Sequence, residues 1–127
     1  TRFSPIKYDF SNPSPNIGWN LRERTDLNSR LPTCDGLICL AVIHHLVIAR
    51  NIPMLQFVFM LKKFSNRGIV EFVDKNDPMV VGLLQGRKDV FPDYTLDNFL
   101  EHMGVLFKVS VLESSKPTRH YVEFREK

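Results

Sequence analysis

The 127 residues are enough for one domain, or part of one, that buries a sizeable core. An apolar fraction of 43% and a charged fraction of 24% are ordinary for a globular chain. The net charge of +3 is too small to indicate a nucleic-acid partner, and the apolar run Gly36–Ile48 is too short to span a bilayer. Beyond these two points, on nucleic-acid binding and membrane spanning, composition and charge exclude no class of function.

The two cysteines indicate a reducing compartment. Cys34 and Cys39 are five positions apart in a predicted strand region, which places them on opposite faces and disfavours a disulfide. Their spacing from the histidines that follow matches no common zinc pattern. We expect no signal peptide, a cytoplasmic location and two buried free thiols.

The amino-terminal third contains few signals of regular structure. Phe3–Phe10 is predicted to form a short strand that leads into a loop, where the prolines of Ser11–Asn16 block regular structure. The next residues are mostly polar, and a short helix is predicted over roughly Arg22–Arg30.

The apolar stretch Asp35–Leu46 organises the rest of the chain. Its run from Leu37 to Ile43 has no charged residue and predicts a strand buried on both faces, as in parallel sheets. His44 and His45 follow the strand directly. In open parallel sheets, ligands bind beyond the carboxyl ends of the strands, so these histidines mark a candidate site.

The remaining elements alternate between helix and strand. A helical turn is predicted over Leu46–Arg50, helices from Pro53 to Phe64, over Met79–Leu84 and over Leu96–Phe107, and strands over Ile69–Val73, Lys108–Leu112 and His120–Arg125. Asp77 and Thr95 are the expected caps of the last two helices. The alternation predicts an α/β layered fold that ends in an antiparallel strand pair.

Several of these segments, taken together and in order, resemble one family. Asp35–Leu46 is similar to the fourth strand and following turn of class I S-adenosylmethionine-dependent methyltransferases. With it, the segments Asn12–Asn20, Ile69–Val73, Asp77–Met79 and Asp89–Thr95 resemble the nodulation-protein-type subgroup. The resemblance runs from about Phe3 to the end of the chain. It implies a Rossmann-like methyltransferase sheet.

The resemblance also implies that only part of this fold is present. Family members begin with a strand and a glycine-rich turn that holds the methionine part of the cofactor, and the six glycines here form no GxGxG group. We therefore expect residues 1–127 to form a single partial domain, the carboxyl-terminal portion of a methyltransferase. Without the first two strands, Leu37–Ala41 would expose a sheet edge that pairs with a second copy or with a complementing chain.

The family's cofactor contacts fall on four residues of this chain. Asp9 and Phe10 match the loop whose carboxylate accepts from the adenine amino group and whose apolar side chain stacks nearby; an Asx turn before Pro13 is the structural alternative. Leu40 and Ala41 match the end of the fourth strand, where the backbone approaches the methionine part of S-adenosylmethionine. Their alternative is plain core packing.

Catalytic candidates rest on chemistry more than on the resemblance. One of His44 and His45 is expected at the pocket mouth, where His45 could take a proton from the methyl acceptor. Glu71 stands within an apolar strand, so it must be paired or protonated, and it could bind a histidine or a substrate amine. His45 could instead be a structural histidine, and Glu71 could lie at a strand end in contact with water.

The sequence thus supports two functions. The first is methyl transfer from S-adenosylmethionine to an unidentified acceptor, by the intact enzyme; Trp19, Arg22 and Arg24 lie where substrate-facing segments are expected. The second is a non-catalytic interaction module that associates through its open sheet edge. Cofactor binding separates the two.

Overall fold

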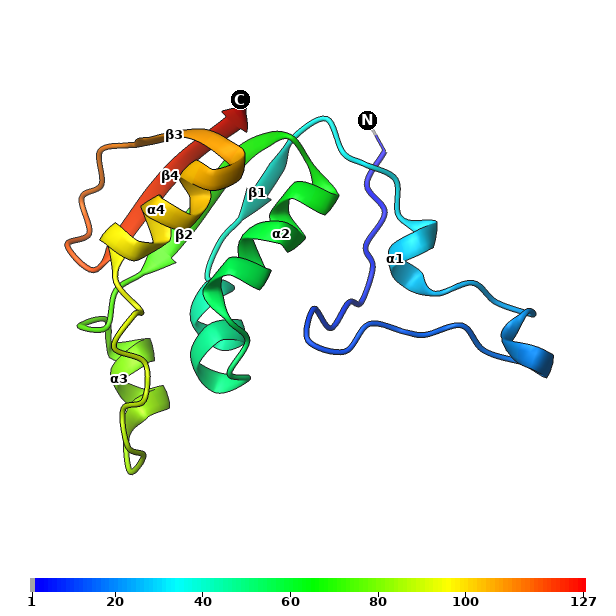
Figure 1. Ribbon diagram of the computed structural model, residues 1–127, viewed down its shortest axis with the longest axis horizontal. Helices are drawn as coiled ribbons and strands as arrows, with labels where there is room; N and C mark the ends of the chain where they lie inside the picture. Colours follow the sequence, from blue (N-terminus) through cyan, green and yellow to red (C-terminus); the bar gives the residue numbers. More distant parts are fainter. Residues whose placement is uncertain (1) are drawn as a thin grey trace. The chain divides into compact units, whose positions relative to one another are not determined.

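A computed structural model describes residues 2–127, which form two compact units divided at Pro32 and Thr33 (Figure 1). The amino-terminal unit has little regular structure: a 3-10 turn η1 (Trp19–Leu21), the single-turn helix α1 (Leu27–Arg30) and one antiparallel bridge between Ile17 and Arg24. Asp26 caps α1 by accepting from the N–H of Ser29 over 2.9 Å.

Two predictions for this unit are wrong. Residues 2–10 contain no strand, and the side chains of Phe3 and Ile6 are 89% and 56% exposed. A strand needs a neighbour to satisfy its backbone groups, and within this unit the only bridge is the one between Ile17 and Arg24. The helix predicted over Arg22–Arg30 is confined to its last turn.

The second unit, Thr33–Lys127, is built on an open four-stranded sheet. Its strands are β1 (Leu37–Cys39), β2 (Arg67–Val73), β3 (Phe107–Val111) and β4 (Arg119–Glu126), in the spatial order β1-β2-β4-β3. β1 and β2 are parallel, and β4 is antiparallel to both β2 and β3. The expected α/β fold with a terminal antiparallel pair is confirmed.

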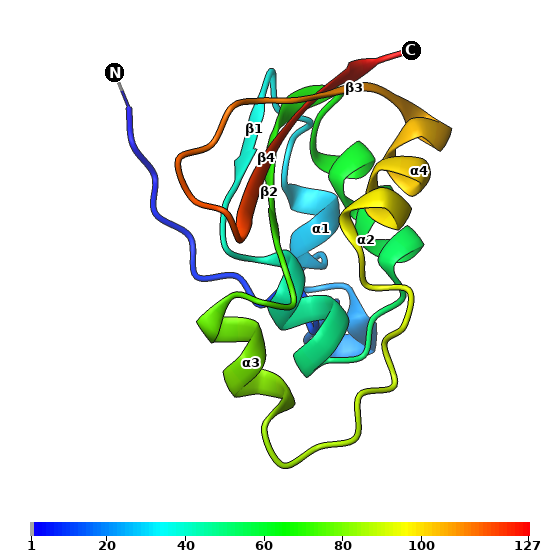
Figure 2. The same cartoon turned by 90° about the vertical axis from the view of Figure 1, so that its left-hand side faces the viewer.

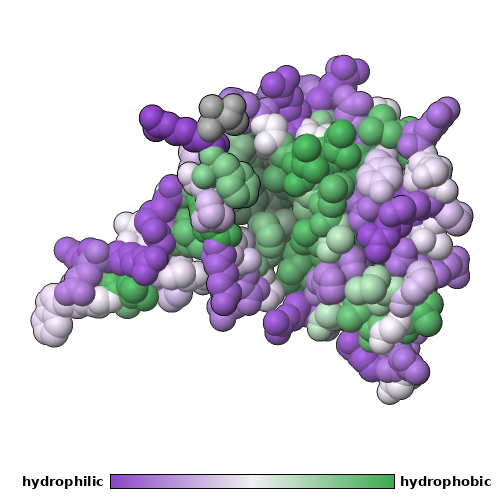
Figure 3. Space-filling model, turned by 180° about the vertical axis from the view of Figure 1, so that it is seen from behind, coloured by the Kyte–Doolittle hydropathy of each residue, from purple (hydrophilic) through white to green (hydrophobic). Residues whose placement is uncertain are grey.

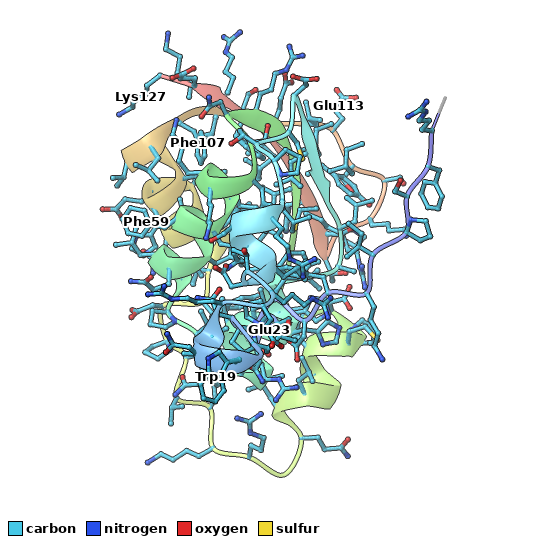
Figure 4. All side chains as sticks on the ribbon, turned by 90° about the vertical axis from the view of Figure 1, so that its right-hand side faces the viewer. Trp19, Glu23, Phe59, Phe107, Glu113 and Lys127 are labelled. Carbon is cyan, nitrogen blue, oxygen red and sulfur yellow. The ribbon has the colours of Figure 1, made fainter. Side chains whose placement is uncertain are left out.

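Helices α2 (Met54–Phe64) and α4 (Leu96–Leu106) cover one face of this sheet, as the edge-on view in Figure 2 shows. Phe57, Phe72 and Phe99 are 0–1% exposed and form the centre of the core. Phe107 begins β3 near the end of the chain at Lys127 (Figure 4), and it packs against Phe124 with the two rings tilted by 55° and their centroids 4.7 Å apart. No helix among residues 2–127 is long and apolar enough to cross a membrane.

The strand at the edge of the sheet departs from the prediction. β1 is only three residues long, and Ile38 and Leu40 are 72% and 50% exposed, so the run Leu37–Ile43 is not buried on both faces. The reason is position: β1 lies at the edge, and α2 and α4 cover only one face of the sheet. The expected open edge at Leu37–Ala41 is present.

The helix caps that the sequence predicted at Asp77 and Thr95 are both present. Asp77 caps α3 (Pro78–Leu84) by accepting from the N–H of Met79, and Thr95 caps α4 by accepting from the N–H of Asn98. Pro53 stands one position earlier than predicted, at the cap of α2. The turn after β1 is the π-helix η2 (His45–Ala49), which contacts α3.

Candidate functional site

A buried polar network joins the carboxyl ends of the two parallel strands. Glu71, near the end of β2, is 4% exposed, and its Oε1 accepts both the N–H of Ala41, 2.9 Å away, and Nη1 of Arg119, 3.0 Å away. Tyr121 lies opposite Glu71 in the register, and a hydrogen bond to Glu71 raises the pKa of its phenol. Glu71 thus links three strand ends.

Arg119 extends the network to the start of α3. Its Nε donates to Oδ2 of Asp77 over 3.1 Å, and the hydroxyl of Thr118 donates to the same oxygen over 2.7 Å. Burial alone would raise the pKa of Asp77, but the hydrogen bonds from Met79, Thr118 and Arg119 outweigh it and hold the pKa below its ordinary value. Asp77 therefore stays ionised and holds the guanidinium in place.

The predicted cofactor residues Leu40 and Ala41 form an exposed turn at the end of β1. Ala41 has a φ of 57°, in the left-handed region that a residue with a Cβ seldom adopts. Glu71 accepts the Ala41 N–H and so holds this turn. The structure thus brings together Ala41 and Glu71, two residues that the sequence assigned to different roles.

Of the two adjacent histidines, His44 is buried and His45 is exposed. His44 is 1% exposed, its ring is 4.1 Å from that of His45, and its Nδ1 has no hydrogen-bond partner among residues 2–127. Burial, followed by the charges of His45 and Arg119, lowers the pKa of His44 to about 4. His45 is exposed and is the histidine of this pair that solvent reaches.

The candidates of the amino-terminal unit have local contacts. Asp9 Oδ1 accepts from the N–H and the hydroxyl of Ser11, at 2.9 and 2.6 Å, which is the Asx-turn arrangement. Phe10 packs edge-on against Tyr8 with ring centroids 4.5 Å apart. Trp19 is 84% exposed (Figure 4), and Arg22 and Arg24 are exposed as well.

Sequence reasoning missed Arg119 and the second role of Asp77. It required a partner for the buried Glu71 but had no means to find one 48 positions away. The available signal was the strand pairing: Arg119 opens the last strand, and an antiparallel partner for β2 places that end beside Glu71. No group of three or more acidic, histidine or cysteine side chains in residues 2–127 could hold a metal ion.

One curated protein provides the comparison. The chain is 37% identical over 127 residues to the nodulation protein NoeA of Rhizobium meliloti (strain 1021), and the alignment covers 98% of this chain and 26% of NoeA. The chain therefore spans about a quarter of the length of this relative. No family model and no solved structure matches. The likeness to a nodulation protein, expected from the sequence, is confirmed.

Proposed function

We propose that this chain is the carboxyl-terminal part of a class I S-adenosylmethionine-dependent methyltransferase, with residues 1–127 as a single partial domain. The observation that carries the proposal is the sheet order β1-β2-β4-β3, a parallel pair followed by an antiparallel pair, with an exposed turn at the carboxyl end of the first strand. The terminal antiparallel pair was predicted from the sequence pattern, and the resemblance implies a Rossmann-like methyltransferase sheet. The proposal assigns no chemical class to the methyl acceptor.

The residues present fit part of the cofactor. The exposed turn at Leu40 and Ala41 leaves the strand end open to a ligand, and the Asp9 carboxylate and Phe10 ring have the chemistry needed for an adenine. The chain contains no GxGxG group for the methionine part. Cofactor binding therefore requires residues outside this chain. When bound, S-adenosylmethionine supplies an electrophilic methyl group.

The chain's own residues then have separate tasks. Glu71 acts as a positioning residue, because its Oε1 already accepts from Ala41 and Arg119 and so holds the turn at the strand end. His45 is exposed beside that turn and can accept a proton from the attacking nucleophile. Alignment of the two reactants supplies most of the acceleration in such transfers.

Binding of S-adenosylmethionine to the full-length polypeptide tests the proposal. Calorimetry should show one cofactor per polypeptide, and Ala41→Arg, which fills the turn, should weaken binding at least tenfold. The matched control Ser114→Arg, in the exposed loop between β3 and β4, should leave binding unchanged. His45→Gln should lower methyl-transfer kcat with little change in cofactor affinity. A full-length polypeptide that binds no cofactor would overturn the proposal.

The open edge of β1 supports a second candidate, a non-catalytic interaction module. Ile38 is 72% exposed on a strand that pairs on one side only, and such edges pair readily with other chains. The module should bind no cofactor alone or with a partner. Native mass spectrometry with and without S-adenosylmethionine distinguishes the two candidates.

A further inference from the structure

Helix α3 is apolar on every side and is nevertheless half exposed. No residue from Pro78 to Leu84 has a polar side chain, and of these residues only Val80 is fully buried. The side chains of Met79 and Val81 are 51% and 54% exposed. Surface helices normally turn polar residues to water, and a helix that is apolar all round is normally buried. The exposed side of α3 therefore has the composition of a contact surface.

The exposed residues of α3 form one continuous face. At about 100° of rotation per residue, Pro78 and Gly82 lie at the centre of this face, with Met79 on one flank and Val81 on the other. A Cβ at Gly82 would meet no atom within 4 Å, so the middle of the face is open. Figure 3, the view from behind Figure 1, shows hydrophobic side chains gathered over α3 at the lower right. The face thus fits a narrow, uncharged chain that lies against Gly82.

The buried network fixes α3 relative to the end of β1. Asp77, which caps α3, accepts from Arg119, and Arg119 also donates to Glu71. Glu71 in turn accepts the N–H of Ala41. α3 also contacts η2, the segment that follows this turn. The apolar face is therefore held at the same edge of the sheet as the proposed cofactor turn.

We propose that the exposed face of α3 binds an apolar, chain-like group of the methyl acceptor, such as an alkyl or acyl chain. The inference rests on the proposed function, because it takes the adjacent turn to hold the methyl donor. Two flanking side chains fall well short of the roughly 800 Å² per partner that a stable protein interface buries. No charged side chain lies between Pro78 and Gly86 to bind an ionic ligand. A carbon chain needs no charged partner, because burial itself supplies its affinity.

Binding of n-alkyl glucosides to the full-length polypeptide, below their micelle concentrations, tests the inference. These probes combine an uncharged head group with chains that range from butyl to octyl. We expect affinity to rise about two- to fourfold with each added methylene, since a fully buried methylene corresponds to about fourfold. An affinity that does not depend on chain length would overturn the inference.

Gly82→Leu is the decisive variant, because it fills the middle of the face while making α3 more apolar. It should lower the affinity for octyl glucoside at least fivefold. Gly104→Leu is the matched control, since a Cβ at this position of α4 also meets no atom within 4 Å, and it should leave the affinity unchanged. Leucine is a better helix former than glycine, so both variants should fold. Equal losses in the two variants, or none in Gly82→Leu, would contradict the inference.

A second pair of variants tests the flank of the face. Val81→Gln should weaken octyl glucoside binding, whereas Val105→Gln, at a position of α4 that is 57% exposed, should not. A lipid surface makes the opposite prediction for Gly82→Leu. Stronger pelleting of that variant with phosphatidylglycerol vesicles, without binding of monomeric octyl glucoside to the parent, would replace the inference with membrane docking.

Calorimetry with S-adenosylmethionine on the same samples separates this inference from the proposed function. Cofactor binding without octyl glucoside binding overturns the inference alone. The reverse result overturns the proposed function and leaves α3 as an alkyl-binding surface of another kind of protein.

Discussion

The backbone N–H of Ala41 donates to Oε1 of Glu71 over 2.9 Å, across 30 positions of sequence. This bond ties the left-handed turn after β1 to the buried end of β2, and Arg119 binds the same carboxylate oxygen. A turn held in this way presents the end of β1 in one conformation. The network therefore explains how an exposed loop of apolar residues could serve as a fixed wall of a binding site.

Removal of the Glu71 carboxylate should destabilise the protein more than any single exposed charge does. Glu71→Ala leaves Arg119 without one of its two partners and the Ala41 N–H without an acceptor, and we expect a loss of about 3 kcal/mol. Glu71→Gln keeps an acceptor for the N–H and should cost less. Urea unfolding of both variants measures the difference.

The more exposed pair of Lys75 and Asp89, with side chains 27% and 46% exposed and Nζ 2.9 Å from Oδ2, provides the control for that experiment. Asp89→Ala should reduce the free energy of unfolding clearly less than Glu71→Ala, because solvent screens an exposed pair. Equal losses in the free energy of unfolding of Asp89→Ala and Glu71→Ala would mean that burial of the Glu71 network does not contribute to stability.

Ala41 should accept glycine without loss of stability. Its φ of 57° costs an L-residue about 1 kcal/mol, which glycine avoids, and this gain offsets the greater freedom of glycine in the unfolded chain. We expect Ala41→Gly to leave the free energy of unfolding unchanged or up to about 1 kcal/mol higher. Ala41→Val should lower it, because β-branching disfavours this conformation further.

Ala49, at the end of η2, is the matched control. It lies in a helical segment, so Ala49→Gly should lower the free energy of unfolding by about 0.5–1 kcal/mol. Thermal or urea unfolding checks all three variants. A clear loss in Ala41→Gly comparable with that of Ala49→Gly would contradict the proposed strain at Ala41.

Gly68 should tolerate no side chain, because β1 approaches it too closely. A Cβ at this position would meet the carbonyl oxygen of its register partner Leu37, which is backbone and cannot move aside. We expect Gly68→Ala to cost about 1–3 kcal/mol and to speed amide exchange in β1. Gly104, in the interior of α4, faces open space, and Gly104→Ala should stabilise by about 0.5–1 kcal/mol.

The parts of this fold that sequence could predict are those with local causes. Asp77 and Thr95 cap their helices through side chains that reach only two or three positions along the chain. Alternation of apolar and polar residues likewise predicted β3 and β4. Phe3–Phe10 has the composition of a strand, but the described structure assigns no strand to these residues, and composition alone cannot reveal that.

The candidate site divides in the same way. The position of Glu71 within an apolar strand indicated that its carboxylate needs a partner. The sequence could not identify Arg119 as that partner, because the place of Arg119 beside Glu71 depends on which strands pair. The adjacent His44 and His45 were equivalent in sequence, and only the π-helical turn of η2 buries one and exposes the other. Strand pairing thus determines the partner of Glu71, and local helix geometry determines which of the two histidines is exposed.

Acid should destabilise the protein through His44. Its folded pKa of about 4 lies below the ordinary value of 6.5, so the unfolded chain binds a proton first as the pH falls. The stability that the neutral ring contributes is complete above pH 6.5 and is lost progressively towards pH 4, by at most about 3 kcal/mol.

His44→Phe and His44→Gln do not titrate, so the stability difference between parent and variant should change over this range. If the difference between parent and both His44 variants stays constant from pH 7 to pH 4.5, the neutral buried ring is excluded.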